Sequence, residues 1–318
     1  MKKVSIVVPC YNEEKSLHLL YKELVVHING LKNYEWEVLF VNDGSEDSTI
    51  EIIKSLRQQD NRISYIDLSR NFGKENAMLA GIDYITGECM VIMDADLQHP
   101  PKLISEMLKY WEKGYDDVYA KRVFRGKESW IRQQLSLLFY KILQKTTRLN
   151  IPQNVGDFRL LDKKCVEVLR KIRETERYTK GLFAWIGFNK KEILFTQGDR
   201  VAGTTSWNFL SLFSLAIEGI ISFSNAPLRI STTIGLFSSF FSFIYLIFIF
   251  AKTIFYGEIV AGYPTLAALI LFIGGVQLFS IGIIGEYVGR IFKETKFRPA
   301  YLIKEYNAQK THNKINNL

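Results

Sequence analysis

The chain has 318 residues, with 41 Lys and Arg against 33 Asp and Glu, and a formal net charge of +8. This length suits one large domain or two modest ones, and the positive charge favours acidic partners such as nucleic acid, anionic lipid or phosphorylated substrates. The three cysteines lie far apart and form no Cys-x-x-Cys or Cys/His cluster, which argues against a zinc site or a disulfide framework.

The N-terminal part has the pattern of an α/β domain. The chain runs directly into VSIVVP, with no charged region, long apolar run and small-residue cleavage site, so we expect no signal peptide and a cytoplasmic N-terminal part. Apolar runs separated by helical spacing predict a mostly parallel sheet covered on both faces. The predicted strands are residues 4–9, 36–43, 63–69 and 88–96, and the predicted helices are residues 12–30, 48–58, 74–86 and 101–113.

Polar clusters follow three of these strands. CYNEE comes after the first strand, NDGSEDS after the second and DADLQ after the fourth. In open α/β sheets, ligands bind at the carboxyl ends of the strands. The three clusters are therefore the candidate functional site.

The DADLQ cluster permits two interpretations. Asp94 and Asp96 are two residues apart, so an extended backbone would point both carboxylates to one side. The two carboxylates would repel each other unless a cation or proton lay between them. Mg²⁺ and Mn²⁺ bind carboxylate oxygens together with phosphate oxygens. Gln98 adds an amide oxygen nearby. Alternatively, Asp96 and His99 only start the helix 101–113, because an isolated D-x-D is a weak motif.

The NDGSEDST cluster is also open to two interpretations. Asp-Gly is a turn signal, and Asp47 or Ser48 can cap the following helix. Asp43, at a strand end, can instead accept hydrogen bonds from a ribose or base. The sequence has no G-x-G-x-x-G, G-x-x-x-x-G-K-[ST], H-E-x-x-H or G-x-S-x-G motif, which argues against dinucleotide-binding, P-loop and the corresponding hydrolase classes.

The C-terminal third contains two uncharged runs, of 22 residues at 230–251 and 21 residues at 265–285. Twenty-two helical residues extend about 33 Å, enough for a bilayer core, so we predict two membrane spans; buried core helices are the alternative. Residues 286–318 carry seven Lys and Arg against three Glu. The positive-inside rule then places both flanks in the cytoplasm and the linker 252–264 outside.

Two further segments are candidates for the membrane surface. Residues 207–223 form an aromatic-rich, apolar helix candidate that Glu218 interrupts. Residues 121–148 hold eight Lys and Arg and one Glu, mixed with apolar side chains. The latter pattern fits a basic helix on an anionic leaflet as well as an ordinary surface helix packed on the sheet.

In combination, VSIVVPCYNEE, VNDGSEDST and MDADLQHPP resemble the strand ends of family 2 glycosyltransferases with the GT-A fold. GDFRLLD (156–162), RVAGTTSW (200–207) and the two apolar runs narrow the resemblance to polyprenyl-phosphate glycosyltransferases, the group of dolichol-phosphate mannose synthase and the bactoprenol glucosyltransferases. The resemblance covers about residues 3–300. One departure is Trp207, where the group has a basic residue or tyrosine after the serine.

The resemblance implies roles for individual residues. Mg²⁺ or Mn²⁺ on the donor diphosphate would be held by Asp94, Asp96 and Gln98. Asp157 would lie near the reacting sugar, although it could also cap a turn after Gly156. The nucleotide-sugar-binding residues would be Pro9, Tyr11, Glu13, Asp43, Lys74, Asp94 and Ala95, and the catalytic residues Asp96, Asp157 and three phosphate-facing arginines, Arg122, Arg132 and Arg200.

The implied domain layout is a cytoplasmic GT-A catalytic domain at 1–206, an interfacial helix at 207–228, two transmembrane helices at 229–290 and a basic cytoplasmic tail at 291–318. The implied reaction is inverting transfer of a hexose from a nucleotide-diphosphate sugar, with UDP as the first choice of nucleotide, to undecaprenyl phosphate. Glucose is the first choice of sugar, N-acetylglucosamine the second, and mannose from a guanosine donor ranks below both. The partners are then these substrates and the cell membrane, without nucleic acid; whether the chain is a homo-oligomer stays open.

Two other functions compete with this one. A glycosyltransferase acting on a sugar hydroxyl, such as a polysaccharide synthase, would share the N-terminal motifs, but the Q-x-x-R-W motif of processive synthases is absent from the sequence. A membrane-anchored sugar-nucleotide binder without catalytic activity would not need the complete metal and arginine set.

Overall fold

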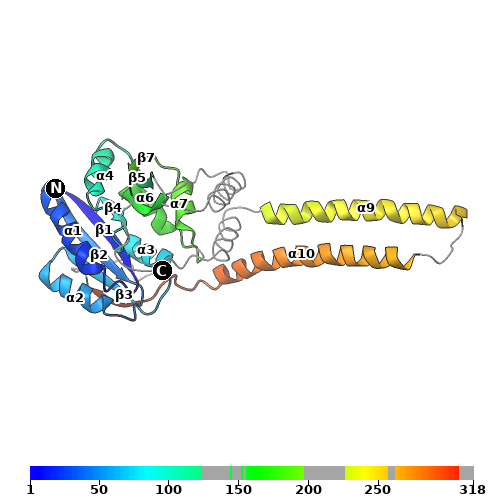
Figure 1. Cartoon of the computed structure of the whole chain (residues 1–318), viewed down its shortest axis with the longest axis horizontal. Helices are drawn as coiled ribbons and strands as arrows, with labels where there is room; N and C mark the ends of the chain where they lie inside the picture. The colour runs from blue at the N-terminus through cyan, green and yellow to red at the C-terminus, as the bar shows by residue number, and fades with distance from the viewer. Residues whose placement is uncertain are drawn as a thin grey trace. The chain divides into compact units, whose positions relative to one another are not determined.

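The computed structural model describes residues 1–123, 144, 152, 155–175, 177–196, 226–256 and 262–307. The chain forms two compact units, Met1–Phe209 with Pro299–Leu318 and Leu210–Arg298. The first unit contains the sheet and the shorter helices, and the second contains two long helices (Figure 1).

The first unit is built on an eight-stranded sheet in the order β7-β5-β6-β4-β1-β2-β3-β8. β1 pairs in parallel with β2 and β4, and β2 pairs in parallel with β3. β6 is antiparallel to both β4 and β5, while β7 returns parallel to β5. The mostly parallel sheet is thus confirmed. The strands are β1 Lys2–Cys10, β2 Tyr34–Asn42, β3 Ile63–Leu68, β4 Cys89–Ile92, β5 Asp117–Arg122, β6 Val155–Asp162, β7 Lys190–Phe195 and β8 Ile303–Asn307.

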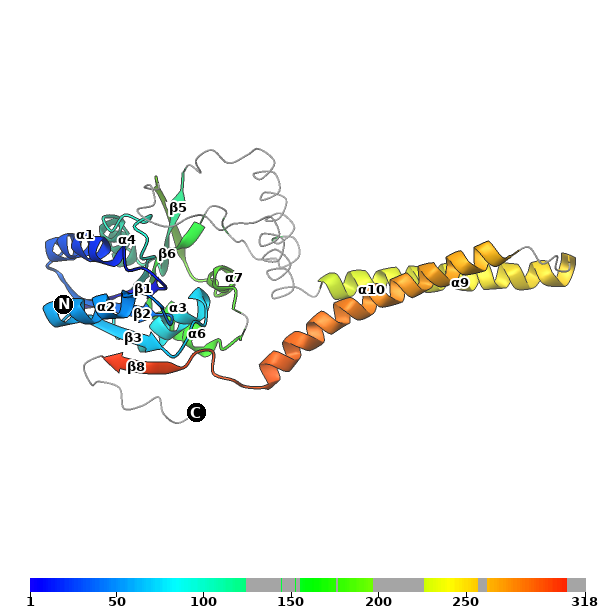
Figure 2. The ribbon, with the colours of Figure 1, turned by 60° about the horizontal axis from the view of Figure 1, so that its bottom comes forward.

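Helices cover both faces of this sheet (Figure 2). The predicted face of α1 is buried, because Leu17, Leu20 and Leu24 pack in one cluster with alternate residues of β1. On the opposite face, Gly81 of α3 lies so close to the Val7 side chain that a larger residue would clash. The helices are α1 Leu17–Gly30, α2 Thr49–Gln59, α3 Lys74–Tyr84, α4 Leu103–Glu112, α6 Lys163–Lys171 and α7 Thr179–Trp185.

The strand β8 lies within residues 291–318, which the sequence analysis treats as a tail. It pairs antiparallel with β3, and the Ser69 N–H donates to the Leu302 carbonyl over 2.9 Å. The Tyr301 hydroxyl donates to Asp83 over 2.6 Å, and Arg173 pairs with the same carboxylate. The chain that follows the second unit therefore returns to the sheet, a pairing that charge counting does not reveal.

The second unit contains α9, Ala226–Tyr256, and α10, Tyr263–Thr295. Among the residues described, one helical segment, Phe272–Thr295, is long and apolar enough to cross a membrane. It overlaps the predicted span 265–285 but begins and ends later. The other predicted span, 230–251, lies inside α9 and stays a prediction. The predicted interfacial helix is placed in the structure only from residue 226 onward, and nearly all of the basic segment 121–148 lies outside the described residues.

Candidate active site

The candidate site lies at the carboxyl ends of β1, β2 and β4, where the sequence predicts it. Asp43 follows β2 and is 3% exposed. Its two carboxylate oxygens accept the backbone N–H groups of Phe72, over 2.7 Å, and Gly73, over 2.9 Å. Burial raises the pKa of Asp43, and these two hydrogen bonds oppose the rise. Asp43 thus fixes the loop before α3.

The loop between β1 and α1 brings the second polar cluster to the same edge. The Glu13 N–H donates to Thr49 Oγ1 over 2.8 Å, which ties this loop to the start of α2. Burial raises the pKa of Glu13; the Ser16 hydroxyl opposes the rise, and Asp96 and Asp94 add to it. Of the other predicted nucleotide-binding residues, Tyr11 is 44% exposed and Ala95 is 2% exposed, while Pro9 lies within β1 beside Val41.

Asp94 and Asp96 come together by a different route from the one predicted. β4 ends at Ile92, so strand alternation does not orient the two acids. They lie in a turn in which Leu97 adopts a φ of 61°, a backbone region that non-glycine residues rarely occupy. Asp96 accepts the Gln98 N–H over 3.1 Å, which closes this turn. Local strain of this kind is typical of functional loops.

His99 completes the acidic cluster. One ligand atom each from Asp94, Asp96 and His99 lies within 4.8 Å of the others, a separation suited to one shared cation. The imidazole is 1% exposed and stacks on Phe158, with ring centroids 5.0 Å apart. Its Nδ1 has no hydrogen-bond partner among the described residues and lies 3.8 Å from Asp94 Oδ2. His99 therefore offers a third ligand atom beside the predicted Asp94, Asp96 and Gln98.

The environment of His99 keeps the imidazole neutral. Burial lowers the pKa of His99, and although Asp94 opposes this, Arg122 reinforces it. Gly156 lies directly behind the ring, where an added Cβ would come within 3.3 Å of Nε2. A neutral imidazole is the form that binds metal ions. From the sequence, His99 is expected only at the start of the helix 101–113; its place directly after the D-x-D-x-Q run is the signal for a ligand role.

Lys74 connects the acidic cluster to Asp157. Its ammonium, in the first turn of α3, lies 2.6 Å from Asp94 Oδ1 and 2.6 Å from Asp157 Oδ2. Burial opposes the charge of Lys74, but the two carboxylates outweigh it and raise its pKa. The same ammonium, followed by Lys180, overcomes the burial of Asp157 and lowers the pKa of that carboxyl. Both groups are therefore charged at neutral pH.

Asp157 lies inside β6 and is 7% exposed, so it does not cap a turn after Gly156. The antiparallel pairing of β6 with β4 brings it to the acidic cluster. Asp94, Asp96 and Asp157 bring three carboxylates to this edge of the sheet, and the ammonium of Lys74 pairs with two of them. Carboxylate oxygens are ligands that Mg²⁺ and Mn²⁺ prefer, so the ligand atoms suit either cation.

Glu75 is a buried carboxyl that the sequence analysis did not identify. Burial raises the pKa of Glu75 to about 7, with Asp157 adding to the rise and Lys74 opposing it. Both the backbone N–H and the hydroxyl of Thr179 donate to this carboxylate. Glu75 therefore joins the start of α3, directly after Lys74, to the start of α7.

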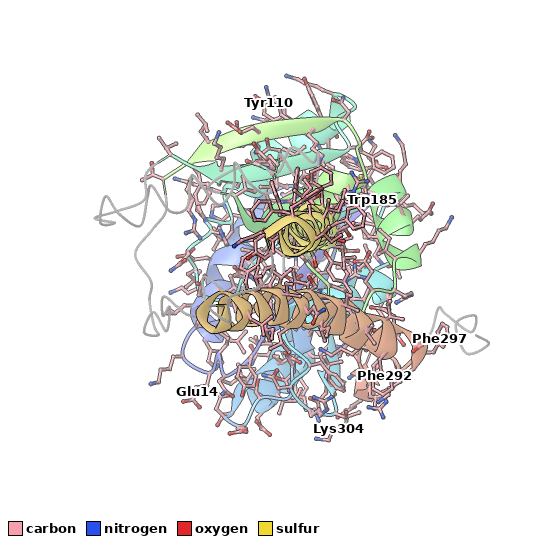
Figure 3. All side chains as sticks on the ribbon, turned by 90° about the vertical axis from the view of Figure 1, so that its right-hand side faces the viewer. Glu14, Tyr110, Trp185, Phe292, Phe297 and Lys304 are labelled. Carbon is pink, nitrogen blue, oxygen red and sulfur yellow. The ribbon has the colours of Figure 1, made fainter. Side chains whose placement is uncertain are left out.

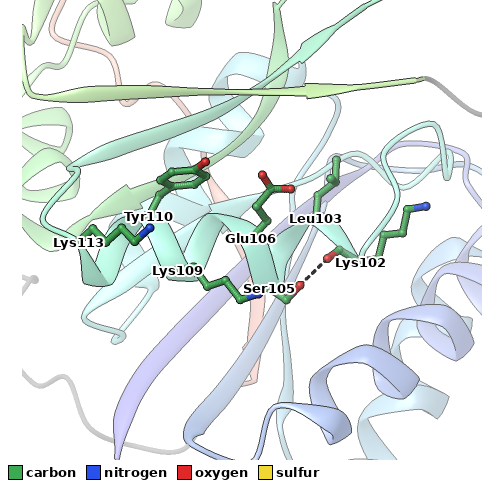
Figure 4. Close-up of a pocket in the computed structure, with 7 residues that line it drawn as sticks. All are labelled: Lys102, Leu103, Ser105, Glu106, Lys109, Tyr110 and Lys113. Carbon is green, nitrogen blue, oxygen red and sulfur yellow. Dashed lines mark hydrogen bonds between the residues drawn. The ribbon is translucent and has the colours of Figure 1, made fainter.

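The structure describes one of the three predicted arginines. Arg122 is the last residue of β5 and contributes to the electrostatic environment of His99. Arg132 and Arg200 lie outside the described residues. A shallow pocket on the outer face of α4 contains none of the predicted residues (Figure 4). Its charged lining consists mostly of lysines.

Comparison with known proteins gives a consistent family relationship. The family model "Glycosyl transferase family 2" matches residues 5–170, and the model "GtrB C-terminal hairpin" matches residues 226–291. A Bacillus subtilis (strain 168) protein, provisionally named glycosyltransferase CsbB, is 45% identical over 96% of this chain and 92% of its own length. The bactoprenol glucosyl transferase of Shigella phage SfX is 43% identical over 95% of this chain and 99% of its own length.

Among solved structures, a glucosyl-3-phosphoglycerate synthase from Mycobacterium tuberculosis, in complex with Mn²⁺, UDP-glucose and phosphoglyceric acid, matches 69% of this chain and 77% of that chain. The TM-score is 0.46 and the identity is 15%.

Proposed function

The chain belongs to glycosyl transferase family 2, and from this premise we propose that it transfers glucose from UDP-glucose to a polyprenyl phosphate with inversion at the sugar. The observation that carries the proposal is the cluster of Asp94, Asp96, Lys74 and Asp157 at the carboxyl ends of the parallel strands. Relatives named bactoprenol glucosyl transferase, similar over nearly the whole chain, support glucose and a bactoprenol-type acceptor. N-acetylglucosamine is the second candidate sugar.

The donor diphosphate fits the acidic cluster through a divalent cation. Asp94 and Asp96, with His99 or Gln98, would hold Mg²⁺ or Mn²⁺, and the buried, unpartnered His99 Nδ1 within the described site supports this fit. When bound, the cation supplies positive charge to the diphosphate as the bond to the sugar breaks. Lys74 lies beside Asp94 and adds a second positive charge toward the same leaving group.

The acceptor needs little help from a base. A phosphate monoester has a second pKa of about 6, so most of it is a dianion at neutral pH. Asp157 has a lowered pKa and a lysine on one oxygen, which makes it a weak proton acceptor. We assign Asp157 the role of orienting Lys74 and stabilising positive charge at the reacting sugar. The phosphate oxygen attacks, the nucleoside diphosphate leaves, and no proton transfer is required.

The return of β8 to the sheet constrains the membrane topology. Both ends of the second unit connect to the same folded domain, because β7 precedes it and β8 follows it in one sheet. A chain that leaves this domain and returns to it must cross a membrane an even number of times. If α10 crosses, α9 supplies the second crossing, and the exposed Phe240, Phe241 and Phe248 suit contact with lipid. We place the catalytic domain in the cytoplasm, where the basic flank 286–318 also belongs.

The proposal is tested with full-length protein in detergent, undecaprenyl phosphate, Mn²⁺ or Mg²⁺, and radiolabelled UDP-glucose, UDP-N-acetylglucosamine or GDP-mannose. Label from UDP-glucose in an acid-labile lipid fraction is the expected result. Label in polymer would favour the hydroxyl-acceptor enzyme. Donor binding without any transfer would favour a sugar-nucleotide binder.

A further inference from the structure

A chain of polar contacts runs along the carboxyl edge of the sheet from β8 to the loop that follows β1. It begins at Asp67, near the end of β3, which is 4% exposed. Asp67 Oδ1 accepts a hydrogen bond from Asn42 Nδ2 over 2.7 Å, and Asn42 is 1% exposed. The two residues are register partners across β2 and β3, so a buried carboxylate directly orients a buried amide.

The orientation of Asn42 determines the next contacts. Because its Nδ2 faces Asp67, its Oδ1 points the other way and accepts the Ser45 hydroxyl over 2.5 Å. Ser45 Oγ in turn accepts the Asn12 N–H over 3.0 Å, and Asn12 Oδ1 accepts the Glu46 N–H over 2.9 Å. Asn12 has a φ of 55°, a conformation that needs such local support.

The returning strand stabilises the other oxygen of Asp67. Lys304 of β8, labelled in Figure 3, places its ammonium 3.4 Å from Asp67 Oδ2. A buried carboxylate is costly without compensating partners. The neighbouring residue in β8, Glu305, serves a different purpose: it accepts hydrogen bonds from Lys54 Nζ and the Tyr65 hydroxyl, each over 2.6 Å. Glu305 holds β8 to the sheet without touching Asn42 in any hydrogen bond described.

We propose that Asp67 is a positioning residue for the donor nucleotide, acting through Asn42 to hold the Ser45 and Asn12 loops in the conformation that the nucleotide meets. Lys304 of β8 supports this role by balancing the charge of Asp67. The proposal rests on the proposed function and on the nucleotide-binding role that the family resemblance implies for Tyr11, Glu13 and Asp43. It makes the segment that follows α10 part of the donor site, although that segment lies far away in the sequence.

The test measures UDP binding to full-length protein in detergent by calorimetry, together with KM for the donor and kcat. Asp67→Ala leaves the Asn42 amide without its acceptor, so UDP binding then has to order the Ser45 and Asn12 loops and should weaken about tenfold. It should raise the donor KM to a similar extent and leave kcat at saturating donor within about twofold. Asp67→Asn retains an acceptor oxygen and should restore binding to within about threefold.

Two further variants separate positioning from folding. Ser45→Ala removes the partly exposed end of the network and should raise the donor KM even if Asp67→Ala is unstable. Glu305→Gln removes the charge that pairs with Lys54 but changes no contact of Asp67 or Asn42, so it should lower the melting temperature while UDP affinity stays unchanged. Wild-type UDP affinity in folded Asp67→Ala and Ser45→Ala, or equal weakening in Glu305→Gln, would overturn the inference. Wild-type protein that binds no UDP would instead refute the proposed donor.

Discussion

The ammonium of Lys74 lies 2.6 Å from the Asp157 carboxylate and thereby joins the first turn of α3 to β6. The same nitrogen lies 2.6 Å from Asp94, in the loop after β4. Three segments that are distant in the sequence therefore share one positive charge. Lys74 compensates part of the acidic cluster, and it stands where a negatively charged leaving group would also need it.

Replacing Lys74 with Met should lower kcat/KM by at least about a hundredfold, because it removes a fixed charge from the leaving-group site. Methionine keeps most of the side-chain length, so the fold should survive. Initial rates with UDP-glucose measure the effect. Lys54→Met serves as the control, because Lys54 pairs with Glu305 and not with Asp94 or Asp157. A Lys74→Met enzyme with near-normal turnover would show that the lysine only balances charge.

Glu75 should give the protein a measurable pH dependence of stability. Its pKa is raised from 4.5 to about 7 in the folded chain. Between these values the folded state holds a proton that the unfolded state has released, so stability falls as pH rises from about 4.5 to about 7 and levels off above. The shift corresponds to at most about 3 kcal/mol.

The Glu75→Gln variant isolates this contribution. Glutamine cannot ionise, so the difference in unfolding free energy between the variant and the wild type should grow in favour of the variant from pH 5 to pH 7. The comparison with wild type is needed because the lowered pKa of His99 acts in the opposite direction over part of this range. Urea unfolding at several pH values provides the measurement, and parallel curves for the two proteins would contradict it.

Asp96→Ala should abolish transfer and leave a folded protein. Asp96 is partly exposed and belongs to the candidate cation cluster with Asp94 and His99, so its loss should weaken the cation site without opening the core. Electron paramagnetic resonance of Mn²⁺ titrated into the protein with UDP should show weaker binding than in the wild type. The control is Asp60→Asn, because Asp60 pairs with Arg62 away from this site. Full activity in Asp96→Ala would refute the metal assignment.

The sequence was sufficient to predict the central strands and the strand-end site, because β-branched runs and helical spacing are local patterns. It was insufficient for β6 and β8. β6 follows the segment around residues 124–154 and pairs antiparallel with β4, so only the tertiary fold brings Asp157 to Asp94. β8 resembled a charged tail because it is an edge strand whose exposed residues include Lys304 and Glu305, and edge strands often carry charged side chains.

The turn around Asp94 illustrates a correct prediction reached for an incorrect reason. An extended backbone would point the carboxylates of Asp94 and Asp96 to the same side of the strand. The strand instead ends at Ile92, and the turn that follows brings the two carboxylates close together. A positive φ is usually signalled in a sequence by glycine, but here the residue with a positive φ is Leu97. His99 was overlooked for a similar reason: its burial against Phe158 depends on β6, which no local pattern places beside it.

His99→Phe should weaken Mn²⁺ binding about tenfold, the lower part of the range for lost ligand-supporting contacts. Phenylalanine retains a flat ring against Phe158 but removes Nδ1, which faces Asp94 over 3.8 Å. Gln98→Ala tests the other candidate ligand in the same titration. If the imidazole coordinates the ion directly, wild-type Mn²⁺ spectra should also show coupling to a histidine nitrogen that is absent in His99→Phe and retained in Gln98→Ala. Unchanged Mn²⁺ affinity in His99→Phe would restrict His99 to packing and leave Gln98 as the third ligand.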